Sequence, residues 1–128
     1  MYRLILSGLV GVMFAGSAFA GDVVAIVNPS VSIDKASVGK IYKSELSGFR
    51  AFDLPEGDAN RETFAKSYTG KSADSLKMLQ MQSLMAGRSL PPKVVDSVAD
   101  MIKAVASTPN GVGYVPSDSV NASVKVIQ

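Results

Sequence analysis

The feature that most constrains the fold is an uninterrupted apolar run, Val23-Val24-Ala25-Ile26-Val27, which ends at Asn28-Pro29. β-Branched residues of this kind favour strands. A strand without polar alternation has to be covered on both faces, as happens in sheets with helices on either side. Pro29 cannot continue the strand. The run therefore predicts a buried strand in an α/β domain.

Helices and further strands follow from capping residues and apolar spacing. Asp34 is a candidate N-cap, and Val38, Ile41 and Tyr42 share one helix face. The spacing predicts an α/β domain in the order β-α-β-α-α-α-β-β, with a small sheet flanked by helices. The other expected helices begin at Asp58 or Asn60, at Ser72 and at Ser97, and the other strands cover 49–54, 112–115 and 124–127.

The first twenty residues have the pattern of a secretory signal peptide. Arg3 provides the positive start, an apolar run follows over 4–14, and Ala18-Phe19-Ala20 is an A-x-A cleavage site. A membrane anchor or a buried helix is the alternative, but the run is shorter than the roughly 20 residues that an anchor needs to span a bilayer. We therefore expect a signal peptide over 1–20, a single domain over 21–128, and a protein located in the periplasm or secreted.

The composition excludes several chemistries. The chain has no His and no Cys, so Ser-His-Asp triads, Cys-His pairs and Cys/His zinc sites are impossible. Without Arg3, the chain has twelve of its thirteen basic residues and eleven acidic ones, so its net charge is close to zero. This charge does not favour nucleic-acid binding, which needs an excess of positive charge. We expect a binding protein and not an enzyme, without a cofactor, a metal or a nucleic-acid partner.

One helix start has a functional interpretation. The segment from Gly57 leads into a helix N-terminus, where free backbone N–H groups and the helix dipole favour an anion. Asn60, Arg61 and Thr63 place donors beside Asp58 at that turn. Asp58 or Asn60 acting only as a cap, with a solvated Arg61, accounts for the same residues. Four carboxylates lie close together in the sequence around this turn, and they could form a metal or acid–base site. We prefer the interpretation that they are solvated charges of a turn and a helix N-terminus, which the helix dipole favours. They belong to Asp53, Glu56, Asp58 and Glu62.

Two other patterns are better explained by structure than by chemistry. Gly70-Lys71-Ser72 is similar to the end of a P-loop, but Ala65 replaces the required glycine, so a helix stop followed by a cap is preferred. Met78, Met81 and Met85 could line an apolar ligand site. We expect them to be core, because methionine commonly fills irregular gaps there.

Three stretches resemble the substrate-binding component of phosphate ABC transporters, within the class II periplasmic binding protein fold. They are the strand and helix over 24–45, the segment 56–64 in the place of the phosphate loop, and Val105-Ala106-Ser107-Thr108-Pro109-Asn110-Gly111-Val112-Gly113-Tyr114-Val115. The resemblance implies one lobe of a periplasmic-binding-protein-like fold with a small mixed sheet. It also implies phosphate or another small anion as ligand, an ABC permease as a possible partner, and a site at Asp58, Asn60, Arg61 and Thr63.

The chain departs from that family in length and in the loop. It has about half the family's length, and Glu56 occupies the position of the family's arginine. A carboxylate there repels an anion instead of clamping it. The alternative function is therefore a one-lobed relative that has lost its ligand and serves as a sensory or assembly partner of an envelope protein. Half of a cleft also exposes apolar surface, which favours a homodimer or another protein partner.

The signal-peptide pattern makes a testable prediction. Cleavage after Ala20 should leave Gly21 as the first residue of the exported protein, because the A-x-A motif ends there. Intact-mass measurement of the protein recovered from the periplasmic or culture fraction checks this. Recovery of a chain that retains 1–20 only in the cytoplasm would contradict it.

Overall fold

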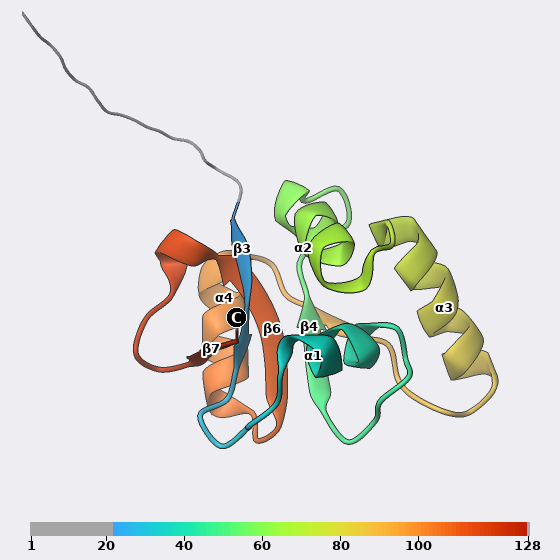
Figure 1. The fold of residues 1–128 in the computed structure, drawn as a ribbon, viewed down its shortest axis with the longest axis horizontal. Helices are drawn as coiled ribbons and strands as arrows, with labels where there is room; N and C mark the ends of the chain where they lie inside the picture. The colour runs from blue at the N-terminus through green and yellow to red at the C-terminus, as the bar shows by residue number, and fades with distance from the viewer. Residues whose placement is uncertain (1–21, 128) are drawn as a thin grey trace, which may run out of the picture.

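A computed structural model describes residues 22–127, and the predicted signal peptide lies outside this range. The domain is built on one five-stranded sheet with the strand order β5-β4-β6-β3-β7. Four α-helices and a short 3-10 turn at Ser117–Ser119 connect the strands (Figure 1). The strands are β3 (Val23–Val27), β4 (Arg50–Asp53), β5 (Lys93–Val94), β6 (Gly111–Pro116) and β7 (Lys125–Ile127), and the helices are α1 (Lys35–Tyr42), α2 (Ala59–Thr69), α3 (Ala73–Met85) and α4 (Val98–Ser107).

The sheet is mixed. β3 pairs antiparallel with both β6 and β7, whereas β4 pairs parallel with both β6 and β5. Four of the five β3 residues are buried, so the prediction of a strand covered on both faces is confirmed. The predicted fold class, an α/β lobe with a small mixed sheet flanked by helices, is confirmed as well.

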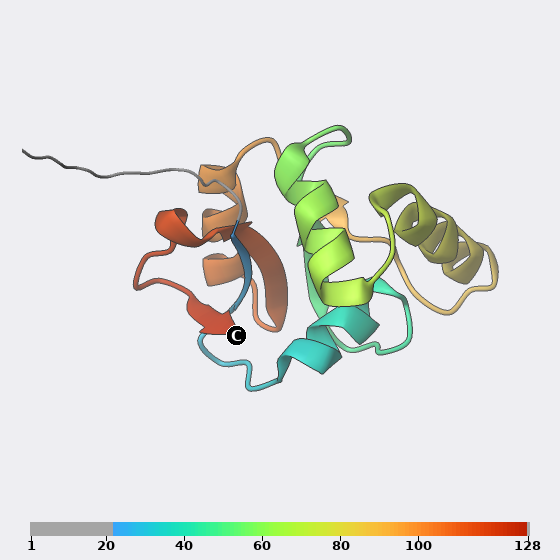
Figure 2. The ribbon, with the colours of Figure 1, turned by 45° about the horizontal axis from the view of Figure 1, so that its top comes forward.

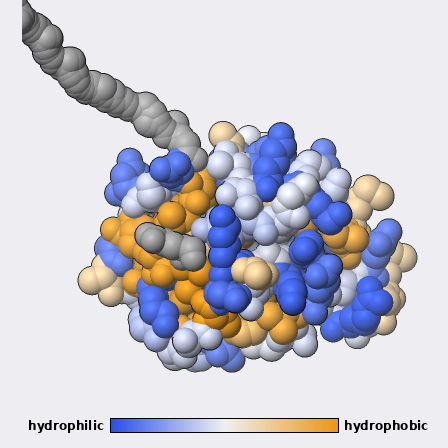
Figure 3. All heavy atoms as spheres, viewed as in Figure 1, coloured by the Kyte–Doolittle hydropathy of each residue, from blue (hydrophilic) through white to orange (hydrophobic). Residues whose placement is uncertain are grey.

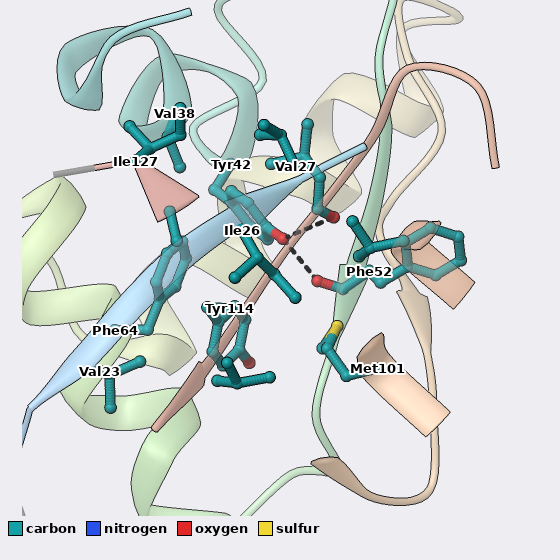
Figure 4. Packing of buried hydrophobic residues seen from close by; sticks show 14 of the residues in the cluster. Val23, Ile26, Val27, Val38, Tyr42, Phe52, Phe64, Met101, Tyr114 and Ile127 are labelled. Carbon is teal, nitrogen blue, oxygen red and sulfur yellow. Dashed lines mark hydrogen bonds between the residues drawn. The ribbon is translucent and has the colours of Figure 1, made fainter. Parts of the chain in front are cut away.

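Alternate residues of β6 face different helices. The ring of Tyr114 stacks on Phe64 of α2, with the ring centroids 4.0 Å apart. A Cβ atom on the neighbouring Gly113 would meet Met101 and Val105 of α4. Because successive strand residues point to opposite faces, α2 and α4 cover opposite sides of the sheet. The core is therefore two-sided, with the aromatic rings of Tyr42, Phe64 and Tyr114 on the α2 side (Figure 4).

The predicted helix boundaries agree with the structure. Asp34, Ser72 and Ser97 each accept a hydrogen bond from a backbone N–H of the first turn that follows. Asp58, one of the two candidates, caps α2. Gly70 ends α2 in the left-handed conformation at φ 73°, so Gly70-Lys71-Ser72 is a helix stop and a cap.

The structure corrects two expectations. The two-residue strand β5 was not predicted, because its pairing with β4 depends on where the chain returns after Pro91-Pro92. The prediction that the α3 methionines belong to the core is wrong, since Met78, Met81 and Met85 are 65%, 44% and 84% exposed. α3 lies at the edge of the domain and packs on one side only (Figure 1). Its buried residues are instead Leu76, Gln80 and Ser83.

No helix within the described range is long and apolar enough to cross a membrane.

A close approach of α1 to α2 generates a stability prediction. A Cβ atom at Gly39 would lie 2.4 Å from the backbone oxygen of Tyr68. Gly→Ala inside a helix ordinarily stabilises by up to about 1 kcal/mol. Here we expect Gly39→Ala to destabilise by about 1–3 kcal/mol, because the helices would have to separate. Urea denaturation measures the effect, and Lys40→Ala on the exposed side of α1 is the control. A stabilised Gly39→Ala would contradict this packing.

Candidate functional site

The predicted site lies where β4 leads into α2. The turn after β4 begins at Pro55, and the backbone N–H of Asp58 donates to the Pro55 oxygen at 3.1 Å. Gly57 takes φ 87° there, a conformation that suits glycine. A surface pocket of about 350 Å³ opens beside this turn. Its lining residues are Glu56, Gly57, Asp58, Ala59, Arg61, Glu62, Ala73, Asp74 and Lys77.

Arg61 is directed into the protein. It is 8% exposed, and its Nη1 donates to the backbone oxygen of Leu54 at 2.9 Å. Its Nε lies 3.6 Å from Oδ1 of Asp53, which is 6% exposed. The guanidinium therefore forms a buried ion pair at the end of β4 and is not a solvated cation.

Tyr114 provides the second partner of Asp53. Its hydroxyl donates to Oδ1 of Asp53 and accepts a hydrogen bond from the backbone N–H of Leu54 at 3.0 Å. Tyr42 donates to the backbone oxygen of Phe52 at 2.5 Å, which holds the same strand end from α1 (Figure 4). The end of β4 is thus fixed by side chains from α1, α2 and β6.

Burial of this cluster raises the pKa values of its Asp53 carboxyl and Tyr114 hydroxyl. Desolvation raises the pKa of the Asp53 carboxyl, although the Tyr114 hydrogen bond and the Arg61 charge oppose the shift. Burial and the nearby Asp53 carboxylate also raise the pKa of the Tyr114 hydroxyl well above its ordinary value. Tyr114 is therefore a hydrogen-bond donor at neutral pH and not a base.

The four residues predicted as a site are only partly brought together. Asp58 and Arg61 line the pocket, whereas Asn60 and Thr63 do not. The Asp58 carboxylate accepts from the backbone N–H of Asn60 at 2.8 Å, which is an N-capping bond. The side chain of Thr63 is exposed on the helix surface. One backbone donor at the helix start is thus already satisfied by the protein itself.

The pocket carries more negative than positive charge. Glu56, Asp58, Glu62 and Asp74 line it, against the two cations Arg61 and Lys77. Lys77 Nζ lies 2.5 Å from a Glu56 oxygen, and this bond lowers the pKa of Glu56. Both cations are therefore already paired with carboxylates. Within the described residues, no group of three or more acidic side chains is arranged to hold a metal ion.

Comparison with known proteins shows the fold. No family model matches the chain, and a search of curated proteins finds no match. Among solved structures, an ABC-type phosphate transport receptor from Vibrio cholerae matches with a TM-score of 0.60 and 21% identity, over 83% of this chain and 45% of that one. The described lobe of this chain is folded like one half of a phosphate ABC transporter substrate-binding protein.

Two further solved structures agree with this similarity. A putative phosphate ABC transporter substrate-binding protein with bound phosphate from Clostridium perfringens gives a TM-score of 0.63 at 15% identity, over 83% of this chain and 44% of that one. PstS from Borrelia burgdorferi gives a TM-score of 0.53 at 16% identity. That match covers 87% of this chain and 48% of the PstS chain. The chain spans less than half the length of each of these proteins. The resemblance inferred from the sequence is confirmed at the level of the fold and of a single lobe.

The sequence analysis did not identify two residues that are central to this site. Asp53 was considered only as one of several turn carboxylates, and Tyr114 only as part of a strand and of the stretch 105–115 that carries the family resemblance, without a polar partner. A tyrosine in a buried strand signals a polar partner, because its hydroxyl has to be hydrogen-bonded. Which carboxylate it meets depends on the pairing of β4 with β6, and that is a tertiary contact.

The buried carboxyl makes a pH-dependent prediction. Because the pKa of Asp53 is raised, the folded protein holds its proton more tightly than the unfolded chain. Its contribution to stability is full below the unfolded pKa, about 3.9, and is lost as the pH rises through the raised folded value. Relative to Asp53→Asn, the wild type should therefore lose stability as the pH rises from about 4.

Urea denaturation of both proteins across that pH range measures the difference. Asp34→Asn is a control of opposite sign, because the Ser37 hydrogen bonds lower the pKa of Asp34. That contribution is present at neutral pH and is lost as the pH falls. If the wild type instead gained stability over Asp53→Asn with rising pH, the Arg61 and Tyr114 contacts would outweigh desolvation.

Proposed function

We propose that this chain is a non-catalytic interaction module of the cell envelope. It uses the fold of one substrate-binding-protein lobe to contact another protein and does not capture phosphate. The observation that carries the proposal is the charge of the α2 pocket, whose lining contains four carboxylates and two cations, and each cation is already paired with a carboxylate. Export through the predicted signal peptide would place the module in the periplasm or outside the cell.

An oxyanion in this pocket would meet an unfavourable field. Arg61 cannot turn toward a ligand without leaving the Asp53 carboxylate buried and unpaired, which ordinarily costs about 3–5 kcal/mol. Lys77 would have to leave Glu56. The helix dipole favours an anion by about 0.3–1 kcal/mol at an exposed terminus. That gain is smaller than the cost of releasing Arg61.

A single lobe also leaves a bound ion exposed to water. Small-molecule sites commonly bury 70–90% or more of their ligand. Charge pairs in a surface pocket contribute only about 0–1 kcal/mol each. Reversible contact with a protein surface needs no such enclosure, and the absence of His and Cys from the sequence disfavours catalysis.

Reversible binding of phosphate or a similar small anion is the second candidate. The fold similarity to phosphate-transport proteins supports it, as does the position of Lys77 beside the start of α2. In this case a second protein, such as an ABC permease or another copy of the chain, would have to close over the ligand. Asp58, Asn60, Arg61 and Thr63 remain the proposed contacts.

Phosphate titration distinguishes the two candidates. We expect no saturable heat from the wild type in isothermal titration calorimetry, because the pocket lining carries four acidic and two basic side chains. Glu56→Arg leaves three acidic and three basic side chains in the pocket lining, and it frees Lys77 from its ion pair. Weak phosphate binding that decreases with added salt should therefore appear.

Glu45→Arg is the matched control. It makes the same change of charge at an exposed residue that is not among the lining residues of this pocket, and it should not create binding. Saturable phosphate binding by the wild type that Lys77→Gln weakens would overturn the interaction-module proposal in favour of the second candidate.

A further inference from the structure

A second surface pocket lies at the opposite end of β4 from the α2 pocket. Arg50 begins β4 and lines this second pocket, whereas Glu56, just beyond the other end of the strand, lines the α2 pocket. The second pocket has a volume of about 200 Å³ and is formed by the loop between α1 and β4 and by the chain that leaves α3. We call it the arginine pocket, after Arg50 and Arg88 in its lining. The two pockets have no lining residue in common, so they are separate sites.

The arginine pocket carries positive charge only. Its lining includes Arg50 and Arg88 and no acidic residue. Both arginines are exposed, and neither forms an ion pair within residues 22–127. Glu45, in the loop between α1 and β4, lies outside the lining and is 3.8 Å from Nζ of Lys43. In contrast to the cations of the α2 pocket, two guanidinium groups are therefore available to an anionic ligand.

The loop between α1 and β4 adds hydrogen-bond donors to this charge. The backbone N–H groups of residues 46–49 donate to no backbone acceptor within the described range. The carbonyl of Ile41 at the end of α1, by contrast, is already satisfied, because it accepts from the backbone N–H of Ser44 at 3.2 Å. Successive free backbone N–H groups in a loop are suited to binding a carboxylate.

Apolar side chains lie beside the arginines on both walls of the pocket. Leu46 comes from the loop before β4 and is 36% exposed, and Leu90 comes from the chain after α3 and is 71% exposed. The hydroxyl of Ser89 lies 2.7 Å from that of the buried Ser83, which holds the second wall against α3. A ligand that carries an apolar group directly beside its anionic group would satisfy both parts of this lining.

We propose that the arginine pocket binds the C-terminal end of a partner protein. The terminal carboxylate lies between Arg50 and Arg88, and an apolar last side chain lies against Leu46 and Leu90. In a chain end both groups are attached to one Cα atom, so they fit a pocket smaller than the roughly 300–1,000 Å³ of ordinary ligand sites. Inorganic phosphate would leave the apolar walls uncovered. This inference rests on the proposed interaction module and names its contact surface and the chemistry of its partner.

The arginine pocket is open to an approaching chain. The loop after α1 and the chain that leaves α3 lie side by side in both ribbon views (Figures 1 and 2). Hydrophilic and hydrophobic residues adjoin one another in the lower part of the molecule in the space-filling view (Figure 3). Because both arginines and Leu90 are already exposed, a chain end can reach them without a rearrangement of the domain.

Nuclear magnetic resonance titration of the isotope-labelled chain tests the site with two matched probes. The first is the peptide acetyl-glycyl-glycyl-leucine with a free carboxylate, and the second is the same peptide with an amidated end. The acid should shift the backbone amide signals of residues 46–49 and of Leu90 saturably. The amide should bind about tenfold more weakly, because it lacks the charge that the arginines recognise. Equal binding of the two peptides, or no saturable shift up to about 10 mM acid, would overturn the proposal.

Substitution of the arginines tests their role in binding the acid. Arg50→Gln and Arg88→Gln should each weaken its binding by about fivefold or more, because each removes one charge-assisted contact. Lys71→Gln is the matched control, since it removes the same charge from an exposed residue outside the lining and should leave binding unchanged. Circular dichroism verifies that the variants are folded. Folded arginine variants that bind the acid as tightly as the wild type would rule out this site.

Two further ligands identify the source of the carboxylate. Free leucine has the same side chain and carboxylate, but its ammonium group is repelled by the arginines, so it should bind more weakly than the peptide acid. Tighter binding of free leucine, or equally tight binding of inorganic phosphate at Arg50 and Arg88, would overturn the assignment to a chain end. Phosphate binding that depends on Lys77 would instead contradict the proposed function and would leave the peptide result unchanged. Failure of this inference and failure of the proposed function are therefore distinguishable.

Discussion

The buried Asp53 carboxylate is the contact on which the geometry of the candidate site depends. It lies at the end of β4 and is held by the Tyr114 hydroxyl from β6 and by Arg61 from α2. The backbone N–H and oxygen of Leu54 complete the same network. Removing one partner of such a pair leaves an uncompensated buried charge, which is more costly than the pair is stabilising. The sheet, the turn and the first part of α2 are therefore coupled through a few polar atoms.

Because of this coupling, a fold shared with the solved structures does not by itself imply a shared ligand. Arg61 follows the N-cap of α2 by three positions, where an exposed cation could serve an anion. In this chain the arginine is used to neutralise Asp53, and Lys77 is used to neutralise Glu56. The pocket that remains is open and has an excess of carboxylates. A lobe can keep its core and its helix arrangement while the charge of its surface changes, because the core depends on apolar burial and the ligand on a few exposed charges.

α3 illustrates a different constraint, which is the choice of the side on which a helix packs. Its sequence has apolar residues around much of its circumference, with Leu76 and Leu79 on one side and three methionines on the other. Apolar spacing alone cannot say which side faces the domain. The hydrogen bond from Gln80 to the backbone of α1 selects the side with Leu76, and the methionines are left in solvent.

The sequence by itself determined the four helices, four of the five strands and the order of these elements. The apolar run at Val23–Val27, the caps at Asp34, Ser72 and Ser97, and the stop at Gly70 act within a few residues of the chain, so local rules were sufficient to find them. Tertiary structure alone decided the pairing of β5 with β4, the direction of Arg61 and the exposure of the methionines. The physical reason is that each of these depends on partners distant in sequence. Asp53 meets Tyr114 across 61 positions, and Gln80 meets Tyr42 across 38. Such contacts exist only after the sheet has assembled.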